Sequence, residues 1–242
     1  MSVGLDVLRL LAATGPAPAA TIARRLGHPR SSTYHLLSVL VENGFVTHYP
    51  DERTYGLGVA AFEIGTAYLR QDRLERLGRP VLARVAGATR ATAQLGVLLG
   101  AEVVYLLKQE PARSIPLVTD VGVRLPAHLT ASGRALLARL PAVEFEAIYP
   151  AGTPLADRTG RGPRSIAALR RLIARERTTG VAIEQGYVSV DIASVAAAAV
   201  DRRGRPQAAV TVSVPSADFA GRRTALVDAV TRAASELSAR LR

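Results

Sequence analysis

Arginine and hydroxyl side chains gather between residues 24 and 38, and their types suit contacts with phosphate groups and base edges. Three of the arginines are Arg24, Arg25 and Arg30, and a fourth, Arg53, follows after a gap. A guanidinium binds phosphate oxygens through two parallel hydrogen bonds, and serine hydroxyls hydrogen-bond to phosphates or bases. Because phosphate contacts depend on a few well-placed cations, this pattern predicts a nucleic-acid surface.

Short helices are predicted to position these side chains. Apolar residues recur with i, i+3, i+4 spacing over residues 3–13 and again over residues 19–26. Gly27 supplies the positive φ that a sharp turn between two helices requires. The apolar positions that we expect to face inward are Leu5, Leu8, Leu11, Ala12, Ile22, Ala23 and Leu26.

A third helix is predicted over residues 32–42, with Ser31 as its N-cap and Asn43-Gly44 at its end. Its polar face is expected to enter the major groove, where the first turn of a helix reaches base edges and phosphates. The inward stripe consists of Leu36, Leu37 and Leu40, and the polar face of Arg30, Ser31, Ser32, Tyr34, His35 and Ser38.

Two β-prone runs, residues 45–49 and 54–57, follow this helix and flank a polar turn. This pattern predicts a hairpin, which after a helix-turn-helix forms a wing. Arg53 at its tip is placed to contact a phosphate or the minor groove. From these residues alone, the alternative to a DNA-reading domain is a three-helix bundle with a hairpin that serves protein contacts.

The net charge of +11 does not locate the binding surface. Residues 1–75 contain 7 Arg and 7 acidic residues, whereas residues 76–242 contain the other 24 Lys and Arg against 13 acidic residues. Lys108 is the only lysine of the chain, so the excess of arginine is compatible with a coding preference rather than a binding surface.

The chain has no Cys, which excludes disulfides and thiolate chemistry and suits a reducing compartment. Its first residues lack a basic leader with an apolar core, and no apolar run reaches the roughly 18 residues of a membrane span. We therefore expect a soluble, cytoplasmic protein without a membrane partner.

From about residue 77 the pattern changes to strands alternating with helices, which predicts an α+β domain of about 165 residues. The expected strands cover residues 93–99, 103–109, 181–184, 194–200 and 208–214, with a turn at 201–206. The expected helices cover residues 77–88, 130–140, 143–148, 166–178 and 222–241, after a linking helix at 59–73. Residues 151–164 are expected to form an exposed loop.

Several longer motifs extend across both halves of the chain. The first half contains LDVLRLLA, IARRLGHPRSSTYHLL, LVENGFV and YGLG. The second half contains VGVRLPAH followed by TASGRALLA, and then SVAA and AAVTVS. With their consistent spacing, these motifs resemble those of the IclR family of transcriptional regulators over essentially the whole chain.

The resemblance implies an N-terminal winged helix-turn-helix and a C-terminal, GAF-like effector-binding domain, in which helices flank a curved antiparallel sheet. It also implies a pocket for a small-molecule effector, a small organic or aromatic acid. Backbone N–H groups at the start of the helix after Thr130 suit a carboxylate. The residues that match the family's pocket are Ser114, Leu117, Ala131, Ser132, Glu184, Ile192, Ser194, Thr211 and Ser213.

Some of these residues have simpler structural explanations. Thr211 and Ser213 share one strand face and could be polar residues that face water, with Ser194 a small core residue. Glu184 would repel a carboxylate unless it is protonated or paired. It would otherwise bind a ligand hydroxyl or amine, or hold a nearby arginine.

The chain departs from the family pattern at three positions. His35 stands where the family usually has Arg, and an imidazole is a poorer phosphate clamp than a guanidinium. Asp191 and Ala198 replace a common Gly and Pro beside the expected pocket, which bears on its shape and charge.

We expect no metal site, no enzyme active site and no cofactor. The histidines, His28, His35, His48 and His128, match no common ligand spacing. The chain lacks a G-x-S-x-G motif, and no histidine is placed as a base beside the serines. His128 is expected to orient the loop before its helix.

We expect three segments: a DNA-binding domain at residues 1–58, a linker helix at 59–76, and an effector-binding and oligomerisation domain at 77–242. The leading hypothesis is a ligand-responsive repressor that binds a palindromic double-stranded DNA operator as a homodimer or homotetramer. The alternatives are an enzyme that acts on a small organic acid, and an architectural DNA binder with a collapsed pocket.

Overall fold

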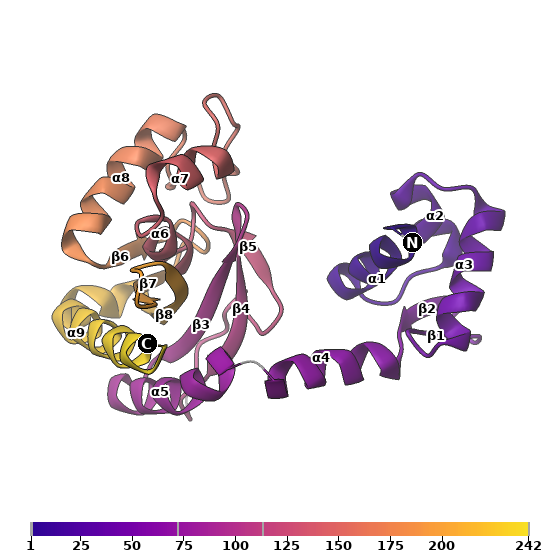
Figure 1. Cartoon of the computed structure of the whole chain (residues 1–242), viewed down its shortest axis with the longest axis horizontal. Helices are drawn as coiled ribbons and strands as arrows, with labels where there is room; N and C mark the ends of the chain where they lie inside the picture. The colour runs from indigo at the N-terminus through magenta and orange to yellow at the C-terminus, as the bar shows by residue number, and fades with distance from the viewer. Residues whose placement is uncertain (1, 72, 113, 242) are drawn as a thin grey trace. The chain divides into compact units, whose positions relative to one another are not determined.

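The computed structural model describes residues 2–71, 73–112 and 114–241, and the chain forms two compact units (Figure 1). The first unit ends at residue 72 and the second begins at Arg73. The segment predicted as a linker contains the helix α4 (Val59–Gln71), which belongs to the first unit, and the start of α5 (Arg73–Thr89), which belongs to the second. Asp72, within that segment, lies outside the described residues.

The first unit contains the predicted helices, α1 (Ser2–Thr14), α2 (Ala19–Leu26) and α3 (Arg30–Glu42). Each of these short helices has one apolar face, and the three faces are buried against one another. The shared core consists of Val7, Leu11, Ala17, Ala19, Ile22, Leu37 and Val46.

The sequence prediction was wrong on two details of these helices. Helix α3 begins at Arg30 with Pro29 as its N-cap, so Ser31 lies in the first turn and does not cap the helix. The carbonyl of Pro29 already accepts the first helical hydrogen bond, at 3.0 Å. In α1, Leu5 and Ala12 are exposed, because the buried positions are Val7 and Leu11, one turn apart.

The predicted hairpin consists of β1 (Val46–Tyr49) and β2 (Thr54–Leu57) in antiparallel register. Backbone hydrogen bonds of 2.9 Å run in both directions between Tyr55 and Ala17, so a third segment flanks β2. A Cβ atom at Gly58 would lie 2.2 Å from the carbonyl oxygen of Gly44 at the end of α3. Only glycine allows this close approach, which fixes the wing to the helices.

The second unit contains a six-stranded antiparallel sheet in the order β5-β4-β3-β8-β7-β6. The five predicted strands are present, and the hairpin between β7 and β8 has its predicted turn. The three-residue strand β5 was not predicted, because it is too short for its alternation to be read. The strands are β3 (Thr92–Leu99), β4 (Glu102–Gln109), β5 (Arg124–Pro126), β6 (Ala182–Gln185), β7 (Ile192–Val200) and β8 (Pro206–Pro215).

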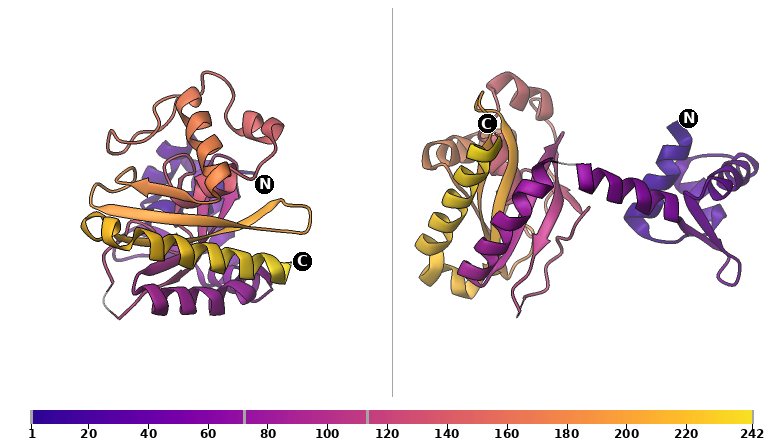
Figure 2. Two further views of the ribbon diagram at one scale, coloured as in Figure 1. Left: turned by 90° about the vertical axis from the view of Figure 1, so that its left-hand side faces the viewer. Right: turned by 60° about the horizontal axis from the view of Figure 1, so that its bottom comes forward.

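Helices cover both faces of this sheet, so the predicted α+β class is confirmed. Helices α5 and α9 (Ser216–Leu241) lie side by side on one face (Figure 2). Helix α6 (Ala131–Leu137) lies on the other face, with α7 (Ala142–Ile148) and α8 (Ile166–Thr179) packed beyond it. The sheet therefore has an apolar layer beneath α5 and α9, and a second, partly polar space beneath α6.

The ends of two helices differ from the prediction. Helix α9 begins at Ser216, directly after β8, because the buried Phe219 extends the apolar stripe of Leu226 and Val230 toward the N-terminus. The helix predicted over residues 130–140 ends at Leu137 and continues as a turn. Within the described ranges, none of the helices has the length and apolar character that crossing a membrane requires.

Candidate nucleic-acid interface and ligand cavity

Helix α3 presents its polar face to solvent. Gly27, between α2 and α3, adopts a φ of 68°. The backbone N–H groups of Gly27 and His28 donate hydrogen bonds to carbonyl oxygens at the end of α2. This left-handed conformation favours glycine, so Gly27 sets the turn that presents α3. Every residue predicted for the polar face is exposed, namely Arg30, Ser31, Ser32, Tyr34, His35 and Ser38.

The predicted cations around α3 are exposed and have no acidic partner among the described residues. A contrast is Arg9 on α1, whose guanidinium lies 3.7 Å from Asp6. A guanidinium without an ion pair keeps its donors for a phosphate. The arginines without such a partner are Arg24, Arg25, Arg30 and Arg53.

Arg53 lies at the tip of the wing, as predicted, with a φ of 51°. Below the tip, the rings of His48 and Tyr55 stack across the two strands with their centroids 4.5 Å apart. This stack joins the strands, so the exposed guanidinium of Arg53 projects from a fixed hairpin.

A small cavity of about 30 Å³ lies between the sheet and α6. This space admits water molecules, at roughly 10–15 Å³ for each, and a larger ligand enters only where the lining side chains move apart. Ser114 is exposed and does not line the cavity. The other eight predicted pocket residues do line it: Leu117, Ala131, Ser132, Glu184, Ile192, Ser194, Thr211 and Ser213.

Neighbouring strands supply the polar floor of the cavity. Glu184 on β6 is opposite Ser194 on β7, which is opposite Ser213 on β8. The hydroxyl oxygens of Ser194 and Ser213 are 2.9 Å apart. Thr211 is 2% exposed, and its Oγ1 has no hydrogen-bond partner among the described residues. The simpler explanation that Thr211 and Ser213 face water is therefore wrong, and the buried Thr211 hydroxyl is an unsatisfied polar group on the cavity wall.

Five polar residues that line the cavity are absent from the predicted pocket set, namely Gln94, Tyr105, Thr119, Thr130 and Ser189. Gln94 donates from Nε2 to Thr119 Oγ1 at 2.6 Å, and the hydroxyl of Tyr105 lies 3.0 Å from Ser132 Oγ. Burial raises the pKa of Tyr105 to about 12, so its hydroxyl remains protonated. The amide of Gln94 within an apolar strand was a readable signal, whereas a strand tyrosine is common in any core.

Glu184 is buried, and its carboxylate accepts hydrogen bonds from the backbone N–H groups of Tyr187 and Val188, the latter at 3.3 Å. Burial raises the pKa of Glu184, against the lowering effects of these N–H groups and of Arg134. The raised pKa favours the neutral carboxyl, which would reduce the repulsion of an acidic ligand.

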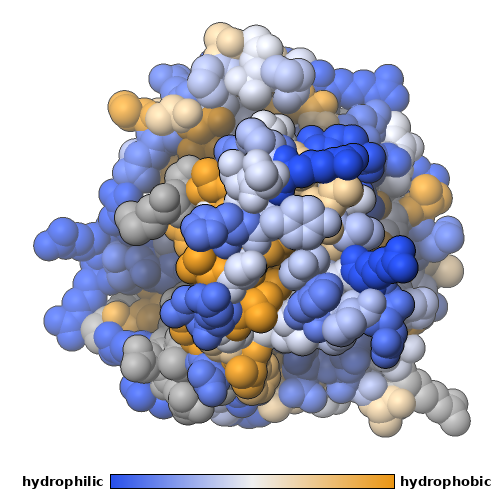
Figure 3. Space-filling model, turned by 90° about the vertical axis from the view of Figure 1, so that its right-hand side faces the viewer, coloured by the Kyte–Doolittle hydropathy of each residue, from blue (hydrophilic) through white to orange (hydrophobic). Residues whose placement is uncertain are grey.

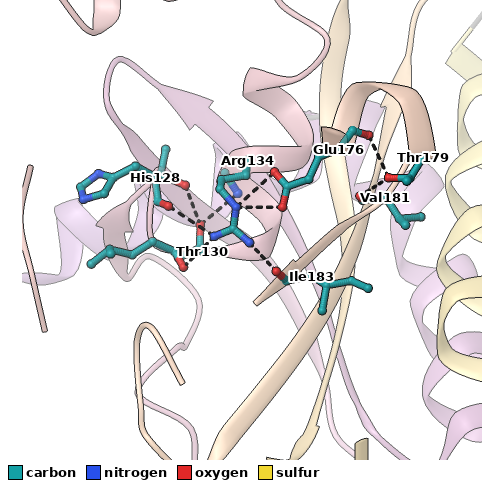
Figure 4. A network of polar contacts seen from close by, with 10 residues as sticks. His128, Thr130, Arg134, Glu176, Thr179, Val181 and Ile183 are labelled. Carbon is teal, nitrogen blue, oxygen red and sulfur yellow. Dashed lines mark hydrogen bonds and ion pairs between the residues drawn. The ribbon is translucent and has the colours of Figure 1, made fainter. Parts of the chain in front are cut away.

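Arg134, in the TASGRA motif, ties the elements behind the cavity together (Figure 4). Its side chain is 0% exposed, and Nε donates to both carboxylate oxygens of Glu176 on α8, at 2.9 and 3.1 Å. Nη2 donates to the carbonyl of Ile183 on β6 at 2.6 Å, and Nη1 to those of His128 and Leu129. Burial raises the pKa of Glu176 although Arg134 opposes this shift. Arg134 therefore organises α6, α8 and β6 without lining the cavity.

The start of α6 approaches the preceding loop closely. A Cβ atom at Gly133 would lie 2.3 Å from the carbonyl oxygen of Ala127, so only glycine fits there. The N-cap residue Thr130 accepts a hydrogen bond from the Gly133 N–H at 2.9 Å. This contact uses one of the N–H groups that were expected to hold a carboxylate.

Two further expectations concern residues outside the cavity wall. Neither Asp191, which is exposed, nor Ala198 lines the cavity. His128 Nε2 lies 2.9 Å from the carbonyl oxygen of Ala156 and so joins the loop at 151–164 to the segment before α6. Burial lowers the pKa of His128, which favours the neutral imidazole.

Over the described part of the chain, no three His, Asp or Glu residues form a group able to hold a metal ion.

A winged helix-turn-helix unit joined to a unit with a polar-lined internal cavity is the architecture of a ligand-sensing transcriptional regulator. Residues 2–50 match the model of the IclR helix-turn-helix domain, and residues 66–239 match that of the bacterial transcriptional regulator IclR C-terminal domain. The chain belongs to the IclR family. It is a DNA-binding transcriptional regulator with an effector-binding domain, and it is not an enzyme.

Similar proteins are found over nearly the full length. The HTH-type transcriptional regulator BhcR from Paracoccus denitrificans is 30% identical over 237 residues, covering 97% of this chain and 84% of BhcR. The HTH-type transcriptional repressor AllR from Klebsiella pneumoniae is 28% identical, covering 88% of this chain and 78% of AllR. An IclR homolog from Microbacterium hydrocarbonoxydans complexed with 4-hydroxybenzoate has a TM-score of 0.85 at 25% identity, over 99% of this chain and 97% of that chain.

Proposed function

We propose that this protein is a ligand-responsive repressor, in which α3 reads a palindromic operator and a small organic or aromatic acid in the cavity changes the affinity for it. The observation that carries this proposal is the exposed first turn of α3, where Arg30, Ser31 and Ser32 have no acidic partner in the part of the chain that the structure describes. An exposed helix start with hydroxyl and guanidinium groups is the arrangement that reads the major groove.

The other predicted residues extend this surface. Tyr34, His35 and Ser38 follow on the next turns of α3 and are assigned to base and phosphate contacts. Arg24 and Arg25 at the end of α2, with Arg53 on the wing, are assigned to phosphates, which fix the register of α3 on the duplex.

The proposed class of effector and the proposed role as a repressor are inferred from the relatives. AllR is a repressor, and the Microbacterium homolog was crystallised with 4-hydroxybenzoate. In this chain, the unpartnered hydroxyl of Thr211 and the pair of Ser194 and Ser213 offer hydrogen bonds to an acid in the cavity. Ligand binding would change the spacing between the recognition helices of two copies. To do so, the ligand must bind one arrangement of the two copies more tightly than the other by several kcal/mol.

Two copies of the chain are needed for specific DNA binding, because one winged helix contacts too few base pairs. Exposed apolar side chains on α1 and α4 offer a surface that a second copy would cover, and Phe62 is 72% exposed. Figure 3 shows a face of the molecule on which apolar residues gather among hydrophilic ones. The protein would then act in the cytoplasm as a homodimer or homotetramer. The apolar residues on α1 and α4 are Leu5, Val59, Phe62 and Ile64.

The DNA assignment is tested with the variant Ser32→Ala/His35→Ala. The operator is first selected from random duplexes with the wild-type protein, and a palindromic consensus is expected. Because a good base contact contributes about 1–3 kcal/mol, the variant should lose operator-specific binding while its fold and oligomeric state persist. The control is Ser235→Ala, which removes an exposed hydroxyl from α9 in the second unit. Unchanged operator affinity in the double variant would refute the role of α3.

The effector assignment is tested with the variant Thr211→Val/Ser213→Ala. A panel of small organic and aromatic acids, including 4-hydroxybenzoate, is screened by thermal shift, since a ligand at a hundredfold excess over its Kd stabilises by about 2.7 kcal/mol. The variant should lose the response and keep its operator affinity. A response that persists at the same ligand concentration would show that the effector binds elsewhere.

A further inference from the structure

The cavity lacks a positive charge to match an acidic ligand. Among the described residues that line it, the ionisable side chains are Glu184 and Tyr105. The guanidinium of Arg134, which is buried behind the cavity, is committed to Glu176 and to backbone carbonyls. A buried carboxylate needs hydrogen bonds or an opposite charge. The hydroxyl groups of the cavity floor can supply hydrogen bonds to one carboxylate, but they supply no charge. A second acid group requires a cation that the cavity wall does not contain.

A cation lies in the same row of the sheet, on β4 next to the strand that supplies Gln94. Thr211 on β8 is the Cα partner of Gln94 on β3, and Gln94 is the Cα partner of Lys108 on β4. Directly opposed residues of antiparallel strands project from the same face. Since Thr211 and Gln94 line the cavity, Lys108 extends from the cavity face of the sheet.

Lys108 is mostly buried, and its partner is easily removed. The Lys108 side chain is 13% exposed, and its Nζ lies 2.9 Å from Oε1 of Glu110, which is 44% exposed. Glu110 can rotate into water without leaving a buried carboxylate behind, whereas the lysine stem stays packed on the sheet. Of the 31 basic side chains of the protein, this is the only lysine. A compact ammonium pairs with a single carboxylate as a point charge.

Gln94 lies between Thr211 and Lys108 in this row, and its amide is bonded to the neighbouring loop. Gln94 donates from Nε2 to Thr119 Oγ1 at 2.6 Å, which joins β3 to the loop before β5. A ligand that offers an acceptor to the Gln94 amide would replace Thr119 without leaving the amide unpaired. The loop can then yield, and the cavity would extend toward Lys108.

We infer that Lys108 anchors a second acid group of the effector, which is therefore a dicarboxylate. One carboxylate is bound by the hydroxyl groups of Thr211 and Ser213, and the other replaces Glu110 at the Lys108 ammonium. The two anchor strands are separated by β3, so their backbones are about 10 Å apart, a span that suits a medium-length diacid. This inference rests on the proposed function of the cavity as the effector site.

The test compares each diacid with the monoacid of the same skeleton. Thermal shift and titration calorimetry on the full-length protein use adipate against hexanoate, and terephthalate against 4-methylbenzoate, at matched ionic strength. In the wild type, the diacid should bind at least tenfold more tightly in one of the pairs. Lys108→Met, which keeps the stem and removes the charge, should abolish this difference. Arg171→Met, which removes an exposed cation on α8, should leave it unchanged.

A second variant keeps the test independent of the folding of Lys108→Met. Glu110→Gln removes the competing carboxylate and should strengthen diacid binding severalfold without affecting the monoacids. Equal binding of diacid and monoacid in both pairs, a preference that survives Lys108→Met, or no gain in Glu110→Gln would each overturn the inference. If monoacids still bind, the proposed effector function stands. If neither kind of acid shifts the melting temperature, both proposals fail.

Discussion

Serine, threonine and arginine are used in opposite ways in the two units. On the polar face of α3 the serine hydroxyls and the guanidinium of Arg30 are exposed, and Arg30 has no ion pair within the described residues. In the second unit, Arg134 is fully buried and bonded to Glu176, and Ser194 is paired with Ser213. The same residue types therefore support recognition in one unit and architecture in the other. Burial, and not residue type, decides which.

This difference has an energetic consequence. An exposed polar side chain contributes little to stability, so substitutions on the α3 face should change DNA binding and leave the unfolding free energy within about 0.5 kcal/mol. A buried polar side chain cannot be removed without leaving its partner unsatisfied. Substitutions around Arg134 should therefore change stability first and ligand response only as a result.

The largest effect is expected from Arg134→Leu. The substitution leaves the Glu176 carboxylate buried without its partner and leaves the Ile183 carbonyl without its donor. Breaking a buried ion pair from one side costs about 3–5 kcal/mol. Urea unfolding of the second unit should show this loss, with Arg171→Leu on the exposed face of α8 as the control. Equal stability of the two variants would contradict the architectural role of Arg134.

A smaller loss is expected from Leu37→Ala, which tests the buried side of the recognition helix. Leu37 is fully buried in the core of the first unit. Truncating a buried leucine to alanine costs about 2–5 kcal/mol. Because this small unit is expected at the lower end of that range, we place the loss below that of Arg134→Leu. The control is the exposed neighbour Tyr34→Ala, which should impair operator binding and leave the unfolding transition in place.

The first unit was predicted from the sequence almost completely, because its contacts are local. The helix spacing, the Gly27 turn and the exposed polar face all follow from residues within a few turns of one another. The exceptions were the exposed Leu5 and Ala12 of α1 and the N-cap of α3, where only the backbone decides between Pro29 and Ser31. The predicted DNA-binding surface therefore depends on patterns between residues that are close in the sequence.

The second unit was predicted in outline but not in its cavity chemistry. Five of the six strands of the sheet and eight of the residues that line the cavity were predicted, because motifs fix their positions. The contacts of Gln94 with Thr119, and of Arg134 with Glu176, join residues 25 and 42 positions apart in the sequence. No periodicity reveals such pairs, since they depend on strand register and helix packing.

A weaker, pH-dependent effect is expected from Glu184→Gln. Burial raises the folded-state pKa of Glu184 above the ordinary value of 4.5, so the folded protein holds this proton more tightly than the unfolded chain. The Glu184 contribution to stability is therefore lost as the pH rises from 4.5 through the folded pKa, and is constant above it. Because glutamine does not ionise, the unfolding free energy of the variant minus that of the wild type should increase over this window. Urea titrations from about pH 4 to pH 7 measure this difference, and a constant value would contradict it.

The smallest effect is expected from Arg53→Ala at the tip of the wing. If this guanidinium binds a phosphate, its loss should weaken binding to operator and to unrelated duplexes by the same few-fold factor, since phosphates carry no sequence information. The slope of log K against log salt should fall by about 0.9 for each protomer. Fluorescence anisotropy over a salt series measures both quantities, with Arg9→Ala, a cation already paired with Asp6, as the matched control. A loss confined to the operator would instead assign Arg53 to a base in the minor groove, and the wing would then read sequence together with α3.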